Sequence, residues 1–116
     1  VQMITASLRC SHCPDGYEFE MGGLKVALKN GEARLVEGGN LAGSTLWLNK
    51  GLKNLVEVTG LPLKDLIRVT SWNQAIELGL GKKLGKVEKG FLADLAVLDP
   101  KTFDVCAVFV EGEQRI

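Results

Sequence analysis

Cysteine and histidine are the residues of this sequence whose types and spacing most directly suggest chemistry. Cys10, His12 and Cys13 lie within four consecutive positions, a spacing at which such side chains can bind one metal ion. A structural zinc site needs four ligands, however, and the chain contains only one histidine and one further cysteine, Cys106. We expect Cys106 to be a small hydrophobic residue buried in a strand. The sequence therefore predicts an adventitious metal contact here, or none.

A glycine-rich stretch at residues 38–46 is the second place where residue types suggest binding. It reads GGNLAGSTL. Glycine tolerates positive φ and lets other groups approach the backbone closely, and Ser44 is a good residue to cap a helix. We predict a loop that opens a helix, where free amide groups could hold an oxygen-rich ligand. The alternative is that these glycines only turn the chain.

Asp94 is a carboxylate in an otherwise apolar run, residues 91–98. Such a run is typical of a strand buried on both faces, and a buried carboxylate must be hydrogen-bonded. We interpret Asp94 as an acceptor for backbone amides of the turn at residues 85–90, rather than as a catalytic group.

Composition and charge limit what the chain can do. Its 116 residues, 46% of them hydrophobic, suffice for one modest core. The 14 basic and 14 acidic residues balance, so we expect no nucleic-acid partner and no membrane partner. No apolar run is long enough to span a bilayer, and no signal peptide is visible. Three cysteines without disulfide-type spacing favour a reducing, cytoplasmic setting.

The first half of the chain is predicted to be mainly β. Residues 1–5 are mostly apolar and predict a strand, and a chain that begins within a strand is expected to be part of something larger. Strands are also predicted over 17–21 and 24–29. Asn30-Gly31 is the strongest short hairpin signal, and it predicts a return strand over 33–36.

The second half is predicted to contain helices and then strands. Apolar residues three and four positions apart predict a helix over 48–59, ended by Gly60. Pro62 is expected to begin a second helix and Ser71 a third. Residues 91–98 and 105–110 predict buried strands. The change in composition near Gly81 places a domain boundary between residues 82 and 83.

Several motifs in this order resemble one known family. They are LAGSTL at 41–46, GLKNLVEVTGLPLKDLIRVT at 51–70, LGLGKKLGKVEKGFLADLAVLD at 78–99 and AVFVEGE at 107–113. The run from Gly85 to Leu95 is typical of the metal-dependent amidohydrolase superfamily. The LAGSTL motif, with the hairpin before it and the paired helices after it, is similar to the N-acetylglucosamine-6-phosphate deacetylase family. The resemblance covers essentially the whole chain.

The resemblance implies an α/β fold class and an architecture. Residues 1–82 would be the C-terminal part of a (β/α)8 barrel, comprising its last strand, a β-hairpin excursion and outer helices. Residues 83–116 would be the C-terminal strands of a small β-sandwich domain. Active sites of such barrels lie at the carboxyl ends of the strands, and Thr5-Ala6 falls at such an end.

The resemblance also implies a chemistry. The family hydrolyses N-acetylglucosamine 6-phosphate to glucosamine 6-phosphate and acetate with a divalent metal, zinc or iron, that activates water. The metal ligands of the family, a glutamate and two histidines, lie on earlier strands, and this chain supplies none of them. An aspartate at the end of the last barrel strand moves the proton to the leaving amine.

This sequence departs from the family at that aspartate. The family reads T-D-A or T-D-S where this chain reads Thr5-Ala6-Ser7, so Ala6 occupies the catalytic position. A methyl group cannot accept a proton, and Asp15 is the nearest other carboxylate in the sequence. We therefore predict no catalytic residue in this chain.

Two further correspondences follow from the resemblance. Leu41, Ala42 and Gly43 align with a backbone segment that contacts substrate in the family, so they are the predicted substrate-binding residues. The family motif N-P-A appears here as Asn73-Gln74-Ala75, a change we interpret as structural.

Two hypotheses follow for the function. In the first, the chain is a segment of an amino-sugar-phosphate deacetylase, inactive on its own, whose partners are the sugar phosphate, the remainder of the barrel and further copies of itself. In the second, it is a non-catalytic or truncated relative that at most binds a ligand or partner. Because one strand cannot close a barrel, unpaired edges are expected to make the isolated chain form homo-oligomers or precipitate.

Overall fold

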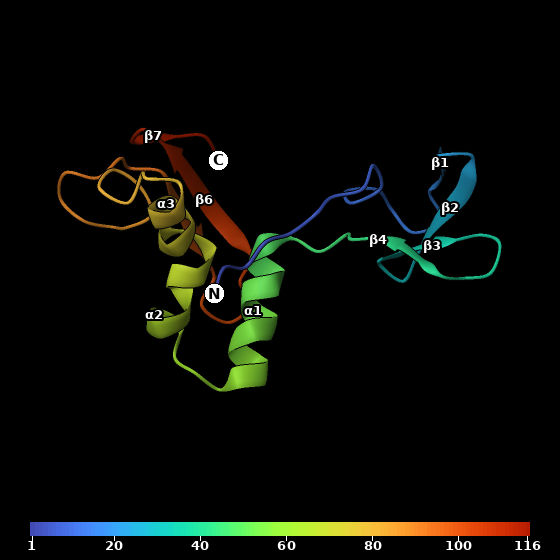
Figure 1. Ribbon diagram of the computed structural model, residues 1–116, viewed down its shortest axis with the longest axis horizontal. Coiled ribbons are helices and arrows are strands. Elements are labelled where there is room, and N and C mark those ends of the chain that lie inside the picture. The colour runs from blue at the N-terminus through green and yellow to red at the C-terminus, as the bar shows by residue number, and fades with distance from the viewer. The chain divides into compact units, whose positions relative to one another are not determined.

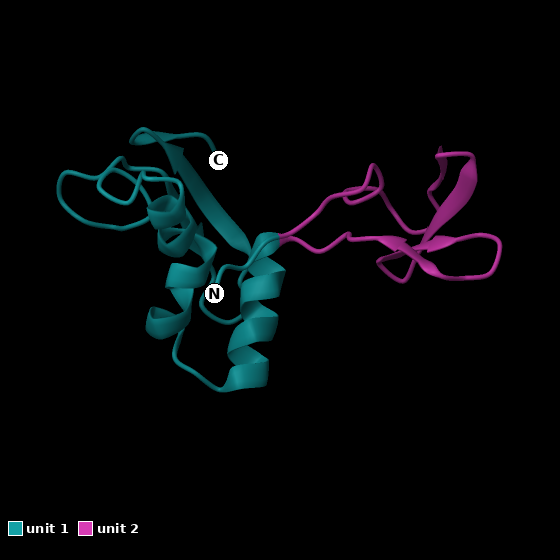
Figure 2. Cartoon of the chain, in the orientation of Figure 1, with its two compact units in different colours: residues 1–4, 48–116 teal, residues 5–47 magenta.

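The computed structural model describes all residues from Val1 to Ile116. The chain forms two compact units (Figure 2). Unit 2 comprises residues 5–47, and unit 1 comprises residues 1–4 together with residues 48–116. This division differs from the predicted boundary after residue 82, which concerns the domains of a larger protein and stays a prediction. None of the helices is both long and apolar enough to cross a membrane.

Unit 2 is an antiparallel meander of four strands in the order β1-β2-β3-β4 (Figure 1). The strands are β1 (Glu18–Met21), β2 (Leu24–Lys29), β3 (Glu32–Leu35) and β4 (Leu41–Gly43). The hairpin predicted from Asn30-Gly31 is confirmed, because both residues have positive φ, 51° and 75°, as a two-residue type I′ turn requires. In β2, Val26 and Leu28 are buried while Lys25 and Lys29 are exposed, the alternation expected of a sheet with one covered face.

The core of unit 2 contains four buried residues. Cys10 reaches it from the segment before β1, and it packs with Val26, Leu28 and Ala33 of the sheet. Partly buried side chains surround this cluster, among them Leu8, Cys13 and Tyr17.

Unit 1 contains the helices and a three-stranded antiparallel sheet in the order β5-β6-β7. The helices are α1 (Leu48–Thr59), α2 (Leu63–Leu66), the 3-10 turn η1 (Ile67–Thr70) and α3 (Trp72–Glu77). The strands are β5 (Leu95–Leu98), β6 (Val105–Val110) and β7 (Glu113–Gln114). The core cluster contains Leu52, Leu66 and Phe103, with Met3, Leu55, Val56 and Leu98 packed against it.

The predicted helix boundaries are confirmed at α1. It ends at Thr59, and Gly60 follows with a φ of 64° and an amide that donates to the carbonyl of Val56. Pro62 precedes α2 as predicted, and Ser71 precedes α3. The Ser71 hydroxyl does not cap α3, however, because it donates to the carbonyl of Gly85.

Three predictions about strands were wrong in this structure. Residues 1–8 contain no strand, because no neighbouring strand is there to complete a hydrogen-bonded ladder. The run at 91–98 is a strand only over Leu95–Leu98. Cys106 was predicted to be buried in β6 but is exposed, and it lies where the pairing of β5 with β6 shifts register, so that it has no partner on β5.

Candidate functional site

The predicted site residues of unit 2 lie on two segments that run close together. The Leu8 amide donates to the carbonyl of Ser44, over 3.1 Å, directly after β4. A side chain on Gly43 would place its Cβ 2.9 Å from Cδ1 of Leu8, closer than real Cβ contacts come. Glycine at position 43 thus permits the two segments to approach. The structure thereby brings the segment that follows Ala6 beside Leu41–Gly43.

The prediction that residues 38–46 form a loop opening a helix was wrong. Leu41–Gly43 form β4, which pairs with β3 through Ala33 opposite Gly43 and Arg34 opposite Leu41. α1 begins only at Leu48. Ser44 does not cap it, since its hydroxyl oxygen accepts from the nearby amide of Leu46. Backbone groups of this stretch are therefore engaged in the sheet. The pairing was not predicted from the sequence, because the partner strand, β3, lies several residues earlier in the chain.

Arg34 organises the loop before β4. Its Nη1 donates to the carbonyl of Gly39 over 2.8 Å, and its other groups contact Glu32 over 2.7–2.8 Å. The glycines at 38 and 39 have φ of 82° and 70°, which favours glycine at both positions. The loop is thus held by a charged side chain of β3 and leads directly into the predicted substrate-binding residues.

Ala6 is exposed and has no titratable group. Asp15, the nearest other carboxylate in the sequence, is occupied in the hairpin. Its Oδ2 accepts from the amide of Asn30 over 2.8 Å, and its Oδ1 accepts from the amide of Gly31 over 3.0 Å. Asp15 therefore holds the turn between β2 and β3, which is a structural role.

The cysteine–histidine segment does not gather into a metal site. Cys10 is fully buried in the core of unit 2. His12 lies against Trp47, with ring centroids 4.8 Å apart, and Nε1 of Trp47 donates to the carbonyl of Ser11 over 3.1 Å. Nowhere in residues 1–116 do three or more histidine, cysteine or acidic side chains come together as a possible ligand set. The residues present do not fit a divalent metal ion.

The side chains of Asn73 and Gln74 hold the first residues of the chain, which gives a specific form to the structural role predicted for them. Nε2 of Gln74 donates to the carbonyl of Met3 over 2.9 Å, and Nδ2 of Asn73 donates to the carbonyl of Val1 over 2.7 Å. The Met3 amide donates to the carbonyl of Val69 over 2.7 Å. Side-chain amides thus bind the segment that leads to Thr5-Ala6.

Asp94 binds a backbone amide, as predicted, but in a different turn. It is exposed, and its Oδ1 accepts from the amide of Glu111 over 2.8 Å, in the turn between β6 and β7. Glu111 has a φ of 52° and Gly112 has a φ of 83°, the conformation of a tight hairpin turn. The sequence could not show this contact, because the two residues meet only when β5 and β6 pair.

Perturbed carboxylates occur in the turn between β5 and β6 of unit 1. Backbone amides of Thr102 and Lys101 donate to Asp99 and lower its pKa below the usual 3.8. The Lys50 ammonium, which forms an ion pair with Asp104, lowers the pKa of that carboxyl in the same direction. Both carboxylates are exposed or half-buried and hydrogen-bonded, so they stabilise a turn rather than activate a substrate.

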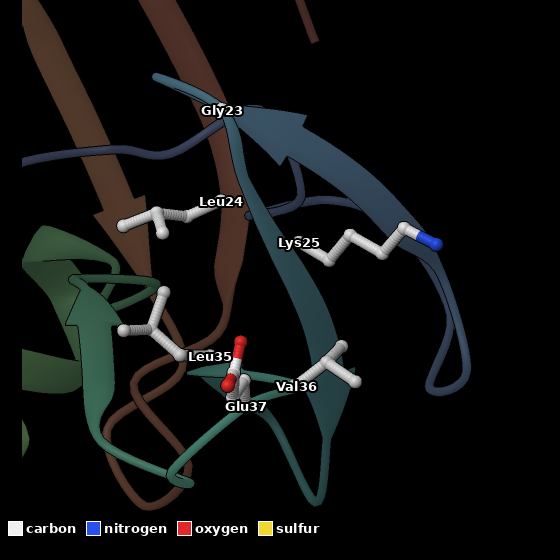
Figure 3. A pocket seen from close by; sticks show the side chains of 6 residues that line it. All are labelled: Gly23, Leu24, Lys25, Leu35, Val36 and Glu37. Carbon is white, nitrogen blue, oxygen red and sulfur yellow. The ribbon is translucent and has the colours of Figure 1, made fainter.

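A shallow hollow of about 540 Å³ lies on the sheet of unit 2 (Figure 3). Leu24, Leu35 and Val36 supply its apolar part, and Lys25 and Glu37 supply one charge of each sign. None of the predicted site residues lines it. The sequence did not predict this hollow, because its lining comes from two separate segments that meet only in the folded sheet.

This chain is similar to known proteins over most of its length. The model of the Amidohydrolase family matches residues 6–115. A curated N-acetylglucosamine-6-phosphate deacetylase from Bacillus subtilis is 36% identical over 96 residues, which are 83% of this chain and 24% of that protein.

Two solved structures are similar over nearly the whole chain. The N-acetylglucosamine-6-phosphate deacetylase of Thermotoga maritima matches with a TM-score of 0.82 at 37% identity, over 98% of this chain and 30% of that one. An aspartate-to-alanine mutant of the Mycobacterium smegmatis deacetylase, in complex with N-acetyl-D-glucosamine-6-phosphate, matches with a TM-score of 0.79 at 32% identity, over 97% and 30%. The chain thus spans about a quarter to a third of the length of these relatives. It belongs to the amidohydrolase family, in which it is similar to part of the N-acetylglucosamine-6-phosphate deacetylases.

Proposed function

We propose that this chain is the carboxyl-terminal part of an enzyme that deacetylates N-acetylglucosamine 6-phosphate, giving glucosamine 6-phosphate and acetate in amino-sugar breakdown. The observation that supports it most is the 0.82 TM-score and 37% identity to the Thermotoga maritima deacetylase over 98% of the chain. The setting would be cytoplasmic. A related N-acetyl amino-sugar phosphate is the alternative substrate.

In this proposal residues 1–82 complete a (β/α)8 barrel and residues 83–116 complete a β-sandwich. The segment at residues 1–5 forms no strand here, and this supports the first part, because neighbouring barrel strands would pair with it. The exposed Cys106 on β6 supports the second, because a facing sheet would cover it.

Leu41, Ala42 and Gly43 would contact the sugar through the backbone, and Ala6 would stand where the family has its catalytic aspartate. The hydrogen bond from the Leu8 amide to the Ser44 carbonyl supports both assignments, because it keeps the two segments adjacent. The family implies a divalent metal, zinc or iron. Because no set of residues in this chain fits such an ion, its ligands would come from the rest of the barrel.

A second candidate is a non-catalytic relative that binds a sugar phosphate or a partner without hydrolysis. Alanine at position 6 favours it, because a methyl group cannot carry a proton. The Mycobacterium smegmatis relative is an aspartate-to-alanine mutant and holds N-acetyl-D-glucosamine-6-phosphate. A relative that has lost an aspartate thus still binds this sugar phosphate.

The experiment compares the full-length protein that carries this segment with its Ala6→Asp variant, and uses Ser7→Asp as the matched control. We expect Ala6→Asp to raise the rate of glucosamine 6-phosphate release by about 10²–10⁴, the usual contribution of general acid–base catalysis, with little change in sugar-phosphate binding. Ser7→Asp should leave the rate low. Binding by all three proteins without any gain from Ala6→Asp would favour the second candidate, and absence of binding would reject both.

A further inference from the structure

The Cys10–Cys13 segment is not used by the proposed function, yet its geometry is specific. The Cys13 amide donates to the carbonyl of Cys10 over 3.0 Å, which closes a four-residue turn. In such a turn the first and last Cα atoms lie within about 7 Å of each other, and disulfides join cysteines whose Cα atoms are about 4.4–6.8 Å apart. The backbone therefore already holds the two residues in the range that a disulfide needs.

The two thiols also share one environment. Cys10 is fully buried, and Cys13 is half-buried and packs against the cluster to which Cys10 belongs. Both are free thiols in this structure. Cys13 is therefore the thiol that an external reagent can reach, and Cys10 is placed to react second, from within the core.

We propose that Cys10 and Cys13 form a reversible disulfide by exchange with a small-molecule disulfide such as oxidised glutathione. The Cys13 thiolate attacks one sulfur of the reagent, and one reduced thiol leaves. The Cys10 thiolate then attacks Cys13 in the mixed disulfide, and the second reduced thiol leaves. Two protein thiols are oxidised, one external disulfide is reduced to two thiols, and the two protons end on the released thiols.

The turn at residues 10–13 is connected by hydrogen bonds to the predicted substrate-binding segment. The amide of Ser11 donates to the carbonyl of Leu8, and Leu8 in turn bonds to Ser44 beside Leu41–Gly43. A covalent bond across residues 10–13 would fix the turn on which this contact rests. The disulfide would thus be a redox-sensitive modification next to the predicted substrate-binding segment, whichever function that segment has.

The test uses the full chain as the Cys106→Ser variant, which removes the exposed third thiol. After equilibration with oxidised and reduced glutathione, the tryptic peptide of residues 10–25 should be lighter by two hydrogen atoms and resist alkylation. Cys10→Ser and Cys13→Ser are the matched controls, and neither can show this loss of mass. Reduction with excess glutathione should restore both thiols.

A second measurement asks whether the folded turn, rather than mere proximity in sequence, brings the thiols together. The equilibrium constant against glutathione should be higher in the native chain than in concentrated urea by about 20-fold, the size expected when a four-residue loop is already closed. Equal constants in the two conditions would overturn the proposal. So would a product carrying glutathione on Cys13 with Cys10 still alkylatable.

Discussion

Single side chains hold the turns that give unit 2 its shape, and Asp15 is the clearest case. One carboxylate accepts from two consecutive amides of the β2–β3 turn, at 2.8 and 3.0 Å. These amides would otherwise lack a protein partner in the turn. Asp15, the carboxylate nearest to Ala6 in the sequence, thus has a structural role.

We expect Asp15→Ala to lower the free energy of unfolding of unit 2 by about 1.5–3 kcal/mol, the range for hydrogen bonds to a charged group. Trp72→Phe provides the background, because Trp47 then reports on unit 2 alone in urea titrations. Glu20→Ala is the control, since Glu20 is exposed and its side chain makes no hydrogen bond or ion pair. Equal losses in the two variants would contradict the role given to Asp15.

The stability of unit 1 at low pH depends on Asp99, which accepts hydrogen bonds from backbone amides in the turn between β5 and β6. Its pKa is below 3.8 in the folded chain, first because of the Thr102 amide and then because of the Lys101 amide. The unfolded state therefore takes up the proton at higher pH than the folded state does. The stabilisation is present above about pH 3.8 and is lost as the pH falls through the folded value.

We expect Asp99→Asn to reduce the loss of folding stability that occurs as the pH falls, because asparagine keeps an acceptor oxygen but does not titrate. Urea midpoints of the Trp47→Phe background, in which Trp72 reports on unit 1, should be compared at pH values from about 3 to about 6. Asp65→Asn, at an exposed carboxylate of α2, serves as control and should keep the wild-type slope. An unchanged slope in Asp99→Asn would show that the turn does not couple to protonation.

One glycine of unit 1 allows a loop and a helix to approach each other closely. Gly85 has a φ of 88°, and a Cβ there would lie 2.7 Å from Cα of Trp72 and 3.1 Å from Cβ of Ala75. The neighbouring Gly90 has a φ of 94° but nothing within 4 Å of such an atom. At Gly85 the loop after α3 therefore lies directly against the start of that helix, whereas at Gly90 there is space for a side chain.

This pair separates backbone strain from steric contact. Gly90→Ala should cost about 1–2 kcal/mol, the penalty for a left-handed conformation. Gly85→Ala should cost the same penalty plus about 1–3 kcal/mol for overpacking against backbone that cannot yield. The readout is Trp72 fluorescence in urea, in the Trp47→Phe background. Equal losses would mean that the loop moves away from α3 without cost.

At the scale of the whole molecule, many apolar side chains remain uncovered. On the β5–β6–β7 sheet Val97 is 47% exposed, Val105 is 44% exposed and Val110 is 42% exposed. A protein of this size that leaves an apolar sheet uncovered is prone to associate. This agrees with the proposal that other chain segments belong on this sheet.

We therefore expect the isolated chain to elute above its 12.5 kDa monomer mass, or to precipitate. The double variant Val97→Thr and Val110→Thr should reduce association, because it makes the exposed strands polar while threonine keeps the β-branched shape. Val87→Thr is the control, since Val87 is 88% exposed but lies outside the strands. Multi-angle light scattering is the measurement, and a monomeric wild-type chain would contradict the expectation.

Local signals in the sequence were sufficient for much of the fold. The Asn30-Gly31 turn, the helix ended by Gly60 and the strand over 105–110 were all predicted, because each depends on residues close together in the chain. Motifs of the same local kind also indicated the amidohydrolase family. At the candidate site, Ala6 was identified as a residue without a titratable group from the sequence alone.

Tertiary structure decided whatever depends on a partner distant in sequence. Leu41–Gly43 became a strand through Ala33 and Arg34, and Asp94 bonded to Glu111 only because β5 and β6 pair. The segment at residues 1–5 lacks such a partner. It has the residues of a strand but forms none, because a strand is completed by hydrogen bonds to a neighbour and not by its own composition.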